Sequence, residues 1–107
     1  MEIHQYQVVV VNLDPTIGSK IKKTRPCVII SPDEMNHNLS TVVIAPLTST
    51  KRNYPTRAKI SLKDKESRVA LDQIRTVDKQ HIVSILSMLK VKEIVEIKSI
   101  INRTYVE

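Results

Sequence analysis

The chain has 107 residues, of which 41% are hydrophobic and 26% charged; this composition excludes an intrinsically disordered protein and predicts one domain over residues 1–107. The formal net charge of +6 at pH 7 favours an anionic partner. The single cysteine, Cys27, excludes an internal disulfide, and no apolar run is long enough to span a bilayer. In the absence of a secretory leader we expect a cytoplasmic protein that makes no membrane contact.

The first half of the chain predicts three strands. The continuous β-branched run "QYQVVVVNL" is typical of a buried strand. Because proline has no ladder donor, we expect Pro26 to open the second strand and Pro46 to end the third. Gly18, the only glycine, is expected to supply a positive φ in the first loop. The predicted strands cover 5–13, 26–31 and 40–47, and irregular segments cover 14–25 and 32–39.

The second half of the chain predicts further strands and a helix. Ala58, Ile60 and Leu62 alternate with polar residues, as in a half-exposed strand. The segment 78–90 fits either a short helical turn followed by a strand or one irregular helix. The remaining predictions are a loop at 48–56, strands at 57–63 and at 68–77 with a bend at Asp72, a tight turn at 64–67, and a helix at 91–105.

The predicted C-terminal helix is apolar around more than half of its circumference. Such a helix either packs deeply within its own chain or is covered on a second side by another subunit. Together with the short strands before it, the helix indicates a mainly β protein with a C-terminal α-helix, built as a small, strongly bent antiparallel sheet or barrel.

Two stretches of the chain are basic and contain no acidic residue. The stretch 16–32 carries four cations, and the stretch 48–63 carries five. If the two stretches share a face, they form a surface that follows a phosphate backbone. The alternative is that both are ordinary solvated loops, and composition alone does not separate these two interpretations.

The motifs of the common enzyme classes are absent. There is no phosphate-binding P-loop, no dinucleotide glycine pattern and no nucleophile elbow. His4, His37 and His81 have no metal-ligand spacing with one another or with Cys27. A conventional metal, nucleotide or catalytic-triad enzyme is therefore not indicated, and we expect no metal and no cofactor.

Polar residues gather instead at the predicted strand ends. Arg25 precedes a proline, which favours an extended backbone there. Thr48 follows the third strand, while Asp72, Gln73 and Arg75 interrupt an apolar one. Such a cluster is either a hydrogen-bonded network that joins strand ends or a binding site.

These residues carry a resemblance to a known family. The motifs L-D-P-x-x-G-S, T-R-P, P-L-T-S and D-Q-x-R-T-x-D occur in this order, starting at Leu13, Thr24, Pro46 and Asp72. In order and spacing the chain resembles the MazF/PemK toxins, which are messenger RNA interferases of type II toxin–antitoxin modules. The resemblance covers roughly residues 5 to 90.

The resemblance implies a fold and an activity. The implied fold is a small SH3-like β-barrel with a C-terminal helix, shared with the CcdB gyrase poisons and homodimeric. The implied activity is sequence-selective, metal-independent cleavage of single-stranded RNA. It assigns catalysis to Arg25 and Thr48. Ser19 and Ala70 stand where some relatives have a catalytic histidine and arginine, so the sequence supports the Arg25 and Thr48 version alone.

The other expected roles concern RNA and the antitoxin. We expect Tyr54 either to stack on a base or to pack beneath its loop beside Pro55. The cognate antitoxin is expected to lay an acidic, disordered tail across the basic groove. The predicted RNA-binding residues are Gly18, Ser19, Lys22, Lys23, Thr50, Lys51, Arg52, Tyr54, Asp72, Gln73 and Arg75.

Two alternative functions remain open from the sequence. The same barrel supports a non-enzymatic poison of the gyrase-inhibiting kind, and it also supports a nucleic-acid-binding module without catalysis. The arginine and threonine of the shared motifs favour the nuclease over both.

Overall fold

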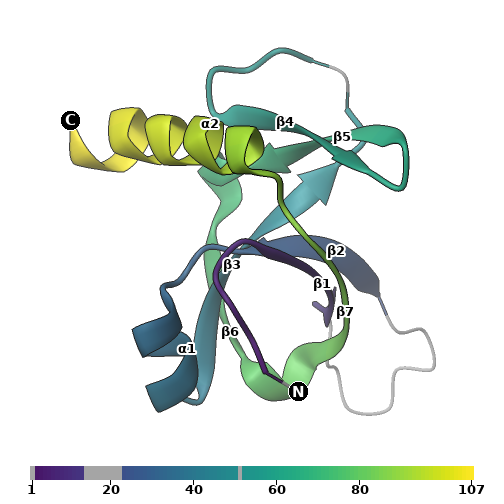
Figure 1. Cartoon of the computed structure of the whole chain (residues 1–107), viewed down its shortest axis with the longest axis vertical. Coiled ribbons are helices and arrows are strands. Elements are labelled where there is room, and N and C mark those ends of the chain that lie inside the picture. The colour runs from purple at the N-terminus through teal and green to yellow at the C-terminus, as the bar shows by residue number, and fades with distance from the viewer. Residues whose placement is uncertain (1, 14–22, 51) are drawn as a thin grey trace.

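The computed structural model describes residues 2–13, 23–50 and 52–107. A bent antiparallel sheet carries one helix on its surface and a longer helix at the C-terminal end (Figure 1). The strands are β1 (Gln7–Asn12), β2 (Thr24–Ile29), β3 (Thr41–Thr48), β4 (Arg57–Leu62), β5 (Lys65–Ala70), β6 (Arg75–Asp78) and β7 (Ile82–Met88). The helices are α1 (Asp33–Asn38) and α2 (Val91–Ile101), with 3-10 turns η1 (Leu71–Gln73) and η2 (Lys79–His81) and a π-helical turn η3 (Asn102–Val106).

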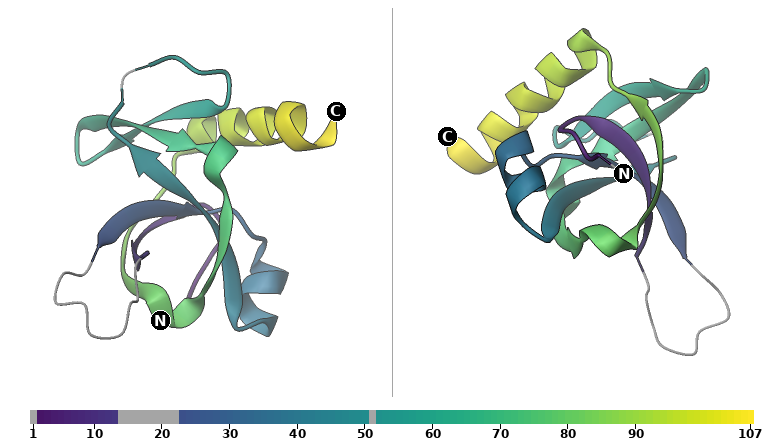
Figure 2. Two further views of the ribbon diagram at one scale, coloured as in Figure 1. Left: turned by 180° about the vertical axis from the view of Figure 1, so that it is seen from behind. Right: turned by 60° about the horizontal axis from the view of Figure 1, so that its bottom comes forward.

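Strand β3 is the centre of the sheet. The strand order is β4-β5-β3-β2-β1-β7, and β6 also pairs with β3. Every pair is antiparallel, and β3 contacts three strands along its length: β6 near its start, β2 in its middle and β5 at its end. The sheet curls into a half-barrel, as Figure 2 shows, so the predicted class, mainly β with a C-terminal helix, is confirmed.

The first strand is buried on both faces, which explains its unbroken apolar sequence. Val8 packs in one core cluster with α2, while Val9 and Val11 pack in a second cluster on the other side of the sheet. In β2, Val28 and Cys27 divide between the same two clusters. Successive residues of a strand point to opposite faces, so a sheet with a core on each face requires continuous hydrophobic runs.

Helix α2 lies across β4 with part of its apolar surface uncovered. Ile97 and Ile100 are buried against the sheet, whereas Val91 is 78% exposed and Val95 is 61% exposed. The predicted helix is therefore confirmed, and the chain itself covers only one side of it. No helix of the described residues has the length and hydropathy needed to cross a bilayer.

Two short elements differ from the sequence predictions. Residues 32–39, expected to be irregular, contain α1, which starts after Pro32 and has Asp33 and Glu34 in its first turn. Acidic residues in the first turn stabilise a helix, and this was the signal that the prediction missed. The turn expected at 64–67 lies one residue earlier: Lys63 and Asp64 have φ values of 50° and 63°, and β5 begins at Lys65. Consecutive positive φ angles are typical of a type I′ hairpin turn.

Both strand prolines lie inside strands, contrary to the prediction that they would begin or end them. Pro26 is the third residue of β2, and β2 pairs with β3 only from Cys27 onward, so Pro26 has a strand partner on one side. Pro46 lies between the part of β3 that pairs with β6 and the part that pairs with β5. At each proline one side of the strand has no partner strand among the described residues, and on that side the missing N–H costs no ladder hydrogen bond.

The C-terminal half of the sheet is divided more finely than predicted. The strand expected over 68–77 is two strands, because η1 interrupts it at Leu71–Gln73 and the chain changes from β5 to β6. Of the two alternatives for 78–90, the structure confirms the first, a helical turn (η2) followed by a strand (β7).

Candidate functional site

A pocket of about 240 Å³ opens where β2 begins and β3 ends. Its walls come from both strands, from the loop after β3, from the first residue of β4 and from η1. The lining residues are Arg25, Pro46, Leu47, Thr48, Thr50, Arg52, Tyr54, Arg57 and Gln73.

The sheet register brings Arg25 and Thr48 to the same end of the pocket. Cys27 of β2 pairs with Pro46 of β3, and this is the last pair of the ladder in that direction. Arg25 and Thr48 each lie two residues further along their strands, so continuation of the antiparallel register sets them opposite each other. Arg25 is exposed and Thr48 is half-buried, so both can reach a ligand in the pocket.

The hydroxyl of Thr48 is oriented by its own loop. The backbone N–H of Thr50 donates to Thr48 Oγ1 at 3.2 Å. A threonine hydroxyl has one proton and two acceptor lone pairs, so this bond uses acceptor capacity and leaves the proton available to a ligand oxygen.

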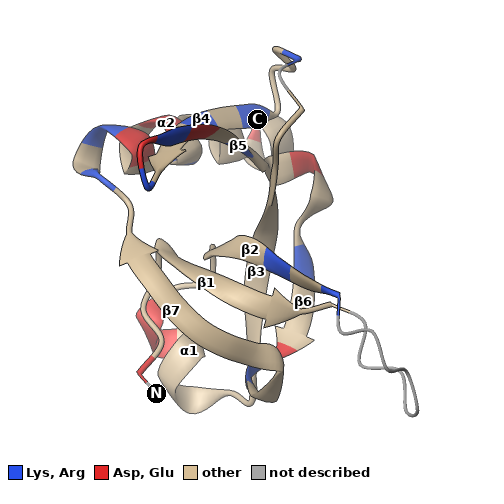
Figure 3. Ribbon diagram, turned by 90° about the vertical axis from the view of Figure 1, so that its right-hand side faces the viewer, with Lys and Arg blue, Asp and Glu red and all other residues tan. Residues whose placement is uncertain are grey.

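The pocket is lined by positive charge. Arg25, Arg52 and Arg57 contribute three guanidinium groups, and no carboxylate is among the described residues that line the pocket. Within residues 2–13, 23–50 and 52–107, no acidic group forms an ion pair with Arg25. In Figure 3 the basic start of β2 contrasts with the layer of α2, β4 and β5, where acidic and basic residues mix. Such a pocket suits a phosphate, which guanidinium groups bind in a bidentate manner.

One of the three arginines is held by an acidic neighbour. Arg57 donates to Asp72 through Nε at 2.9 Å and through Nη2 at 3.4 Å, and Thr56 Oγ1 donates to the same carboxylate at 3.0 Å. The hydrogen bond from Arg57 is the main reason that the pKa of Asp72 lies below its usual range. Asp72 is therefore ionised at neutral pH and cancels much of the Arg57 charge.

The aromatic ring in the pocket contacts two arginines. The guanidinium carbon of Arg57 lies 5.0 Å from the centroid of the Tyr54 ring, in the range of a cation–π contact. Arg52 Nη1 donates to the Tyr54 hydroxyl at 3.1 Å. The residue is nevertheless 42% exposed, so Tyr54 does not pack beneath its loop, which was one of the two expectations for it.

The structure brings together six of the predicted site residues and separates others. Asp72 does not line the pocket but bonds to Arg57, which does, and neither Arg75 on β6 nor Lys23 lines it. His37 lies on α1 and does not line the pocket either. The six that line it are Arg25, Thr48, Thr50, Arg52, Tyr54 and Gln73, while Gly18, Ser19, Lys22 and Lys51 lie outside the described residues.

Arg57 is the residue of the pocket that sequence reasoning missed. It belongs to a recognised basic stretch, but its importance follows from contacts with Tyr54, three residues away, and with Asp72, fifteen residues away. The strand alternation gave one signal: Ala58 and Ile60 face the core, so Arg57 had to face the other side.

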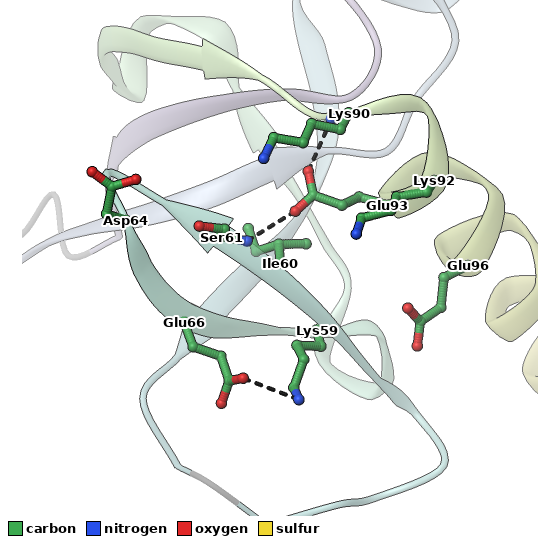
Figure 4. Close-up of a pocket in the computed structure, with 9 residues that line it drawn as sticks. All are labelled: Lys59, Ile60, Ser61, Asp64, Glu66, Lys90, Lys92, Glu93 and Glu96. Carbon is green, nitrogen blue, oxygen red and sulfur yellow. Dashed lines mark hydrogen bonds and ion pairs between the residues drawn. The ribbon is translucent and has the colours of Figure 1, made fainter.

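A larger pocket of about 510 Å³ between the β4–β5 hairpin and the start of α2 has a different character. Its charged lining residues are three lysines and four acids. Figure 4 shows Lys59 paired with Glu66, at 3.0 Å, and Glu93 turned toward the backbone N–H groups of Ser61 and Lys90. The charges are thus balanced or already used within the fold, and the smaller pocket is the better anion site.

Three side chains near the N-terminus lie close to one another, although their spacing in the sequence does not suggest a set of metal ligands. Ligand atoms of Glu2, His4 and His37 lie within 4.8 Å of one another, and Asp33 Oδ2 lies 3.2 Å from His4 Nδ1. Spacing along the sequence did not reveal the group because α1 brings His37 back to the N-terminal segment. None of these residues lines the arginine-rich pocket, so the cluster is separate from it.

Cys27, which neighbours the pocket in sequence, is not a nucleophile. Its side chain is fully buried, and burial raises the pKa of the thiol to about 12, although Arg25 and Arg75 act in the opposite direction. A thiol attacks as its thiolate, and at this pKa almost none is present at neutral pH.

Comparison with known proteins identifies relatives along almost the whole chain. Residues 4–105 match the family model of PemK-like, MazF-like toxins of type II toxin–antitoxin systems. The chain is 33% identical over 106 residues to the endoribonuclease MazF of Staphylococcus epidermidis, a match that covers 94% of this chain and 88% of that protein.

Solved structures have the same fold at lower identity. An endoribonuclease in complex with its cognate antitoxin, from a mycobacterial species, superposes with a TM-score of 0.81 at 22% identity and covers 94% of this chain and 92% of its own. MazF from Deinococcus radiodurans gives a TM-score of 0.78 at 19% identity, with 96% of each chain covered.

Proposed function

We propose that Arg25 and Thr48 are the catalytic pair of this protein, because the chain belongs to the PemK-like, MazF-like toxins of type II toxin–antitoxin systems. The protein is an endoribonuclease. Its substrate is single-stranded RNA, cut at short sequence motifs without a metal or other cofactor. The observation that carries this proposal is that Arg25 and Thr48 line one pocket that contains three arginines.

The chemistry requires little beyond positioning and charge stabilisation, since RNA supplies its own nucleophile. The 2′-oxygen forms a bond to the adjacent phosphorus while the bond from phosphorus to the 5′-oxygen breaks. One proton leaves the 2′-hydroxyl and one arrives at the 5′-oxygen, and a cyclic phosphate and a 5′-hydroxyl result. The enzyme must align the two oxygens and stabilise the negative charge on the five-coordinate phosphorus.

Arg25 and Thr48 suit these two tasks. The planar guanidinium of Arg25 can hold two phosphate oxygens at once. Thr48, whose oxygen accepts a bond from the Thr50 N–H, directs its proton to a phosphate oxygen or to the leaving 5′-oxygen.

Other residues bind the rest of the strand. We assign backbone phosphates to Lys22, Lys23, Lys51 and Arg52, since lysine and arginine contacts release counterions from the nucleic acid. A half-open groove can read splayed bases by edges that a duplex hides, which favours single strands. The residues assigned to sugar and base contacts are Gly18, Ser19, Thr50, Tyr54, Gln73 and Arg75.

A second copy of the chain covers the open edge of the sheet. Among the residues that the structure describes, strand β7 pairs with β1 alone, and neither strand carries a charged residue (Figure 3). Val83 is 55% exposed, Ile85 38% and Met88 52%. Exposed apolar edges promote association, so we place the homodimer interface at β7 and beside it at the uncovered side of α2.

The antitoxin is the second protein partner. A mycobacterial relative of the same fold was solved with its cognate antitoxin. For this chain, with its net charge of +6, the fitting inhibitor is an acidic, disordered segment that orders across the arginine-rich pocket. Messenger RNA is the proposed substrate, and we place this toxin in the cytoplasm, where that substrate is found.

One assay tests the catalytic proposal. The purified protein is incubated with single-stranded RNA in the presence of a chelator, beside the folded variants Arg25→Ala and Thr48→Ala. Cleavage by the wild type that is lost in both variants supports the proposal. RNA that stays intact with the wild type would favour a non-enzymatic poison or a binding module, although no structural observation favours either.

A further inference from the structure

We propose that Asp72 does not contact RNA but positions Arg57, and that Arg57 in turn supports the Tyr54 ring as a stacking surface for one nucleobase. This inference rests on the proposed RNA substrate. It replaces the RNA-binding role expected for Asp72 with a positioning role, and it gives Arg57 a role of its own.

The carboxylate of Asp72 already has partners at both oxygens. Oδ1 accepts from Thr56 Oγ1 at 3.0 Å and from Arg57 Nε at 2.9 Å, and Oδ2 accepts from Arg57 Nη2 at 3.4 Å. A carboxylate offers about four acceptor sites, and three of those of Asp72 are taken, so a base bound there would compete with its charge-assisted pair to the guanidinium. An unpaired carboxylate would also repel the phosphates of the strand. Both considerations indicate that Asp72 binds groups of the protein rather than the ligand.

Arg57 is held where it can support the ring. Its side chain is only 11% exposed, and its guanidinium lies 5.0 Å from the centroid of Tyr54. The Arg57 backbone N–H also donates to the carbonyl oxygen of Tyr54 at 3.1 Å. Asp72 fixes the guanidinium through two of its nitrogens, and the cation then covers one part of the ring.

The rest of the Tyr54 ring is left for a ligand. The residue is 42% exposed, and its hydroxyl is fixed by Arg52 Nη1 at 3.1 Å. A ring that is held at its hydroxyl and beside the Arg57 cation loses little further freedom when a base stacks on it. Because every base has a π-face, such a surface tolerates sequence variation while it adds affinity.

The other aromatic rings are already used by the fold. The chain has three tyrosines and no tryptophan or phenylalanine. Tyr6 packs against the core cluster beneath α2, and Tyr105 donates its hydroxyl proton to the carbonyl oxygen of Leu71. Tyr54 is the tyrosine that lines the pocket, so the stacking role falls to it.

The absence of tryptophan from the sequence allows a direct test of stacking. In Tyr54→Trp the new indole is the only one, and a stacked base quenches its fluorescence. The probes are a mixed-sequence 2′-O-methyl oligonucleotide, which has no 2′-hydroxyl to attack, and an abasic oligonucleotide of equal length. We expect quenching by the first probe and not by the second.

Three outcomes of this experiment overturn the proposal. Equal quenching by both probes shows that the indole reports phosphate binding and not stacking. If fluorescence anisotropy shows that the first probe binds but the indole is not quenched, the stacking role is refuted and the proposed function stays intact. Failure of the wild type to bind either probe overturns the proposed function and this inference with it. If Tyr54→Trp does not fold, Tyr54→Leu serves, with an expected loss of roughly 5- to 150-fold in affinity for the base-bearing probe.

A double-mutant cycle tests the positioning role of Asp72. Asp72→Asn is expected to lower the affinity for the base-bearing probe several-fold. The affinity for the abasic probe should stay the same or rise, because a negative charge is removed. In an Arg57→Ala background the same change should have almost no further effect. Asp64→Asn, in the β4–β5 turn, is the matched control. Additive losses, or a loss for some base sequences only, would show that Asp72 reads a base directly and would refute the positioning role.

Discussion

Arg25 and Thr48 are 23 positions apart in the sequence, yet each lies two residues beyond the same ladder pair, Cys27 with Pro46. Their separation is therefore set by the antiparallel register of β2 and β3. A strand that is paired along its length holds side chains more rigidly than a loop does, and a catalytic pair needs that rigidity. The first prediction follows from this placement.

Replacement of Arg25 or Thr48 by alanine should lower the rate of RNA cleavage strongly. Removal of one donor to a developing oxyanion costs about 10²- to 10³-fold. The measurement is the single-turnover rate with a fluorescent single-stranded RNA in chelator. Thr41→Ala, at the opposite end of β3, is the control and should cleave normally. A Thr48→Ala variant that keeps the wild-type rate would remove Thr48 from the mechanism.

Neutralisation of four residues from the two basic stretches of the sequence should weaken RNA binding without a change of cleavage motif. Replacement of Lys22, Lys23, Lys51 and Arg52 by glutamine removes phosphate contacts. The slope of log K against log salt is negative, and each lost contact should make it less steep by about 0.7 for a single strand. Binding is measured by anisotropy across a salt series, and Lys65→Gln on the β4–β5 hairpin serves as control. A new motif preference in the mapped 5′ ends would contradict the assignment.

A charge placed on the open edge of the sheet should separate the dimer. Val83→Glu introduces a carboxylate into the exposed apolar strip of β7, and burial of an unpaired charge at an interface is strongly unfavourable. Light scattering after size-exclusion chromatography should give the dimer mass for the wild type and the monomer mass for the variant. Leu39→Glu, equally an exposed apolar site but after α1, should stay dimeric. An unchanged mass for Val83→Glu would place the interface elsewhere.

Loss of the Glu93 side chain should destabilise the fold. Glu93 is 6% exposed and accepts hydrogen bonds from the backbone N–H groups of Ser61 and Lys90, so it joins α2 to β4. In Glu93→Ala two partly buried donors lose their partner, which should cost about 1–3 kcal/mol of unfolding free energy. Glu96→Ala, on an exposed position of the same helix, should change it by less than about 0.5 kcal/mol. Equal urea midpoints for the two variants would contradict this role.

The buried thiol predicts a loss of stability in alkali. Burial raises the pKa of Cys27 from 9.0 to about 12, so between these values the unfolded chain is ionised while the folded chain is not. Ionisation then favours the unfolded state, and the contribution present below pH 9 is lost as the pH rises. Urea midpoints at pH 8 and pH 10 should fall less in Cys27→Ala than in the wild type. An equal fall in both proteins would assign the alkaline loss to other groups.

Much of the fold could be predicted from local patterns. The β-branched run of β1 and the alternation of Ala58 and Ile60 indicate strands, and a strand shows its period within a few residues. The wide apolar surface predicts α2 in the same way. The motifs that contain Arg25 and Thr48 also pointed to this family before any contact was known. All of these are properties of short segments, or of their order along the chain.

The sequence by itself determined the elements, the family and the identity of the two strand-end residues, because periodicity and motif order are local. Only the tertiary structure decided that Arg57 joins Asp72 to Tyr54, since that contact depends on how the chain folds back between β4 and η1. It likewise decided that His4 meets His37. Contacts between segments many residues apart follow from strand register and helix packing, which the whole core sets at once and no single segment encodes.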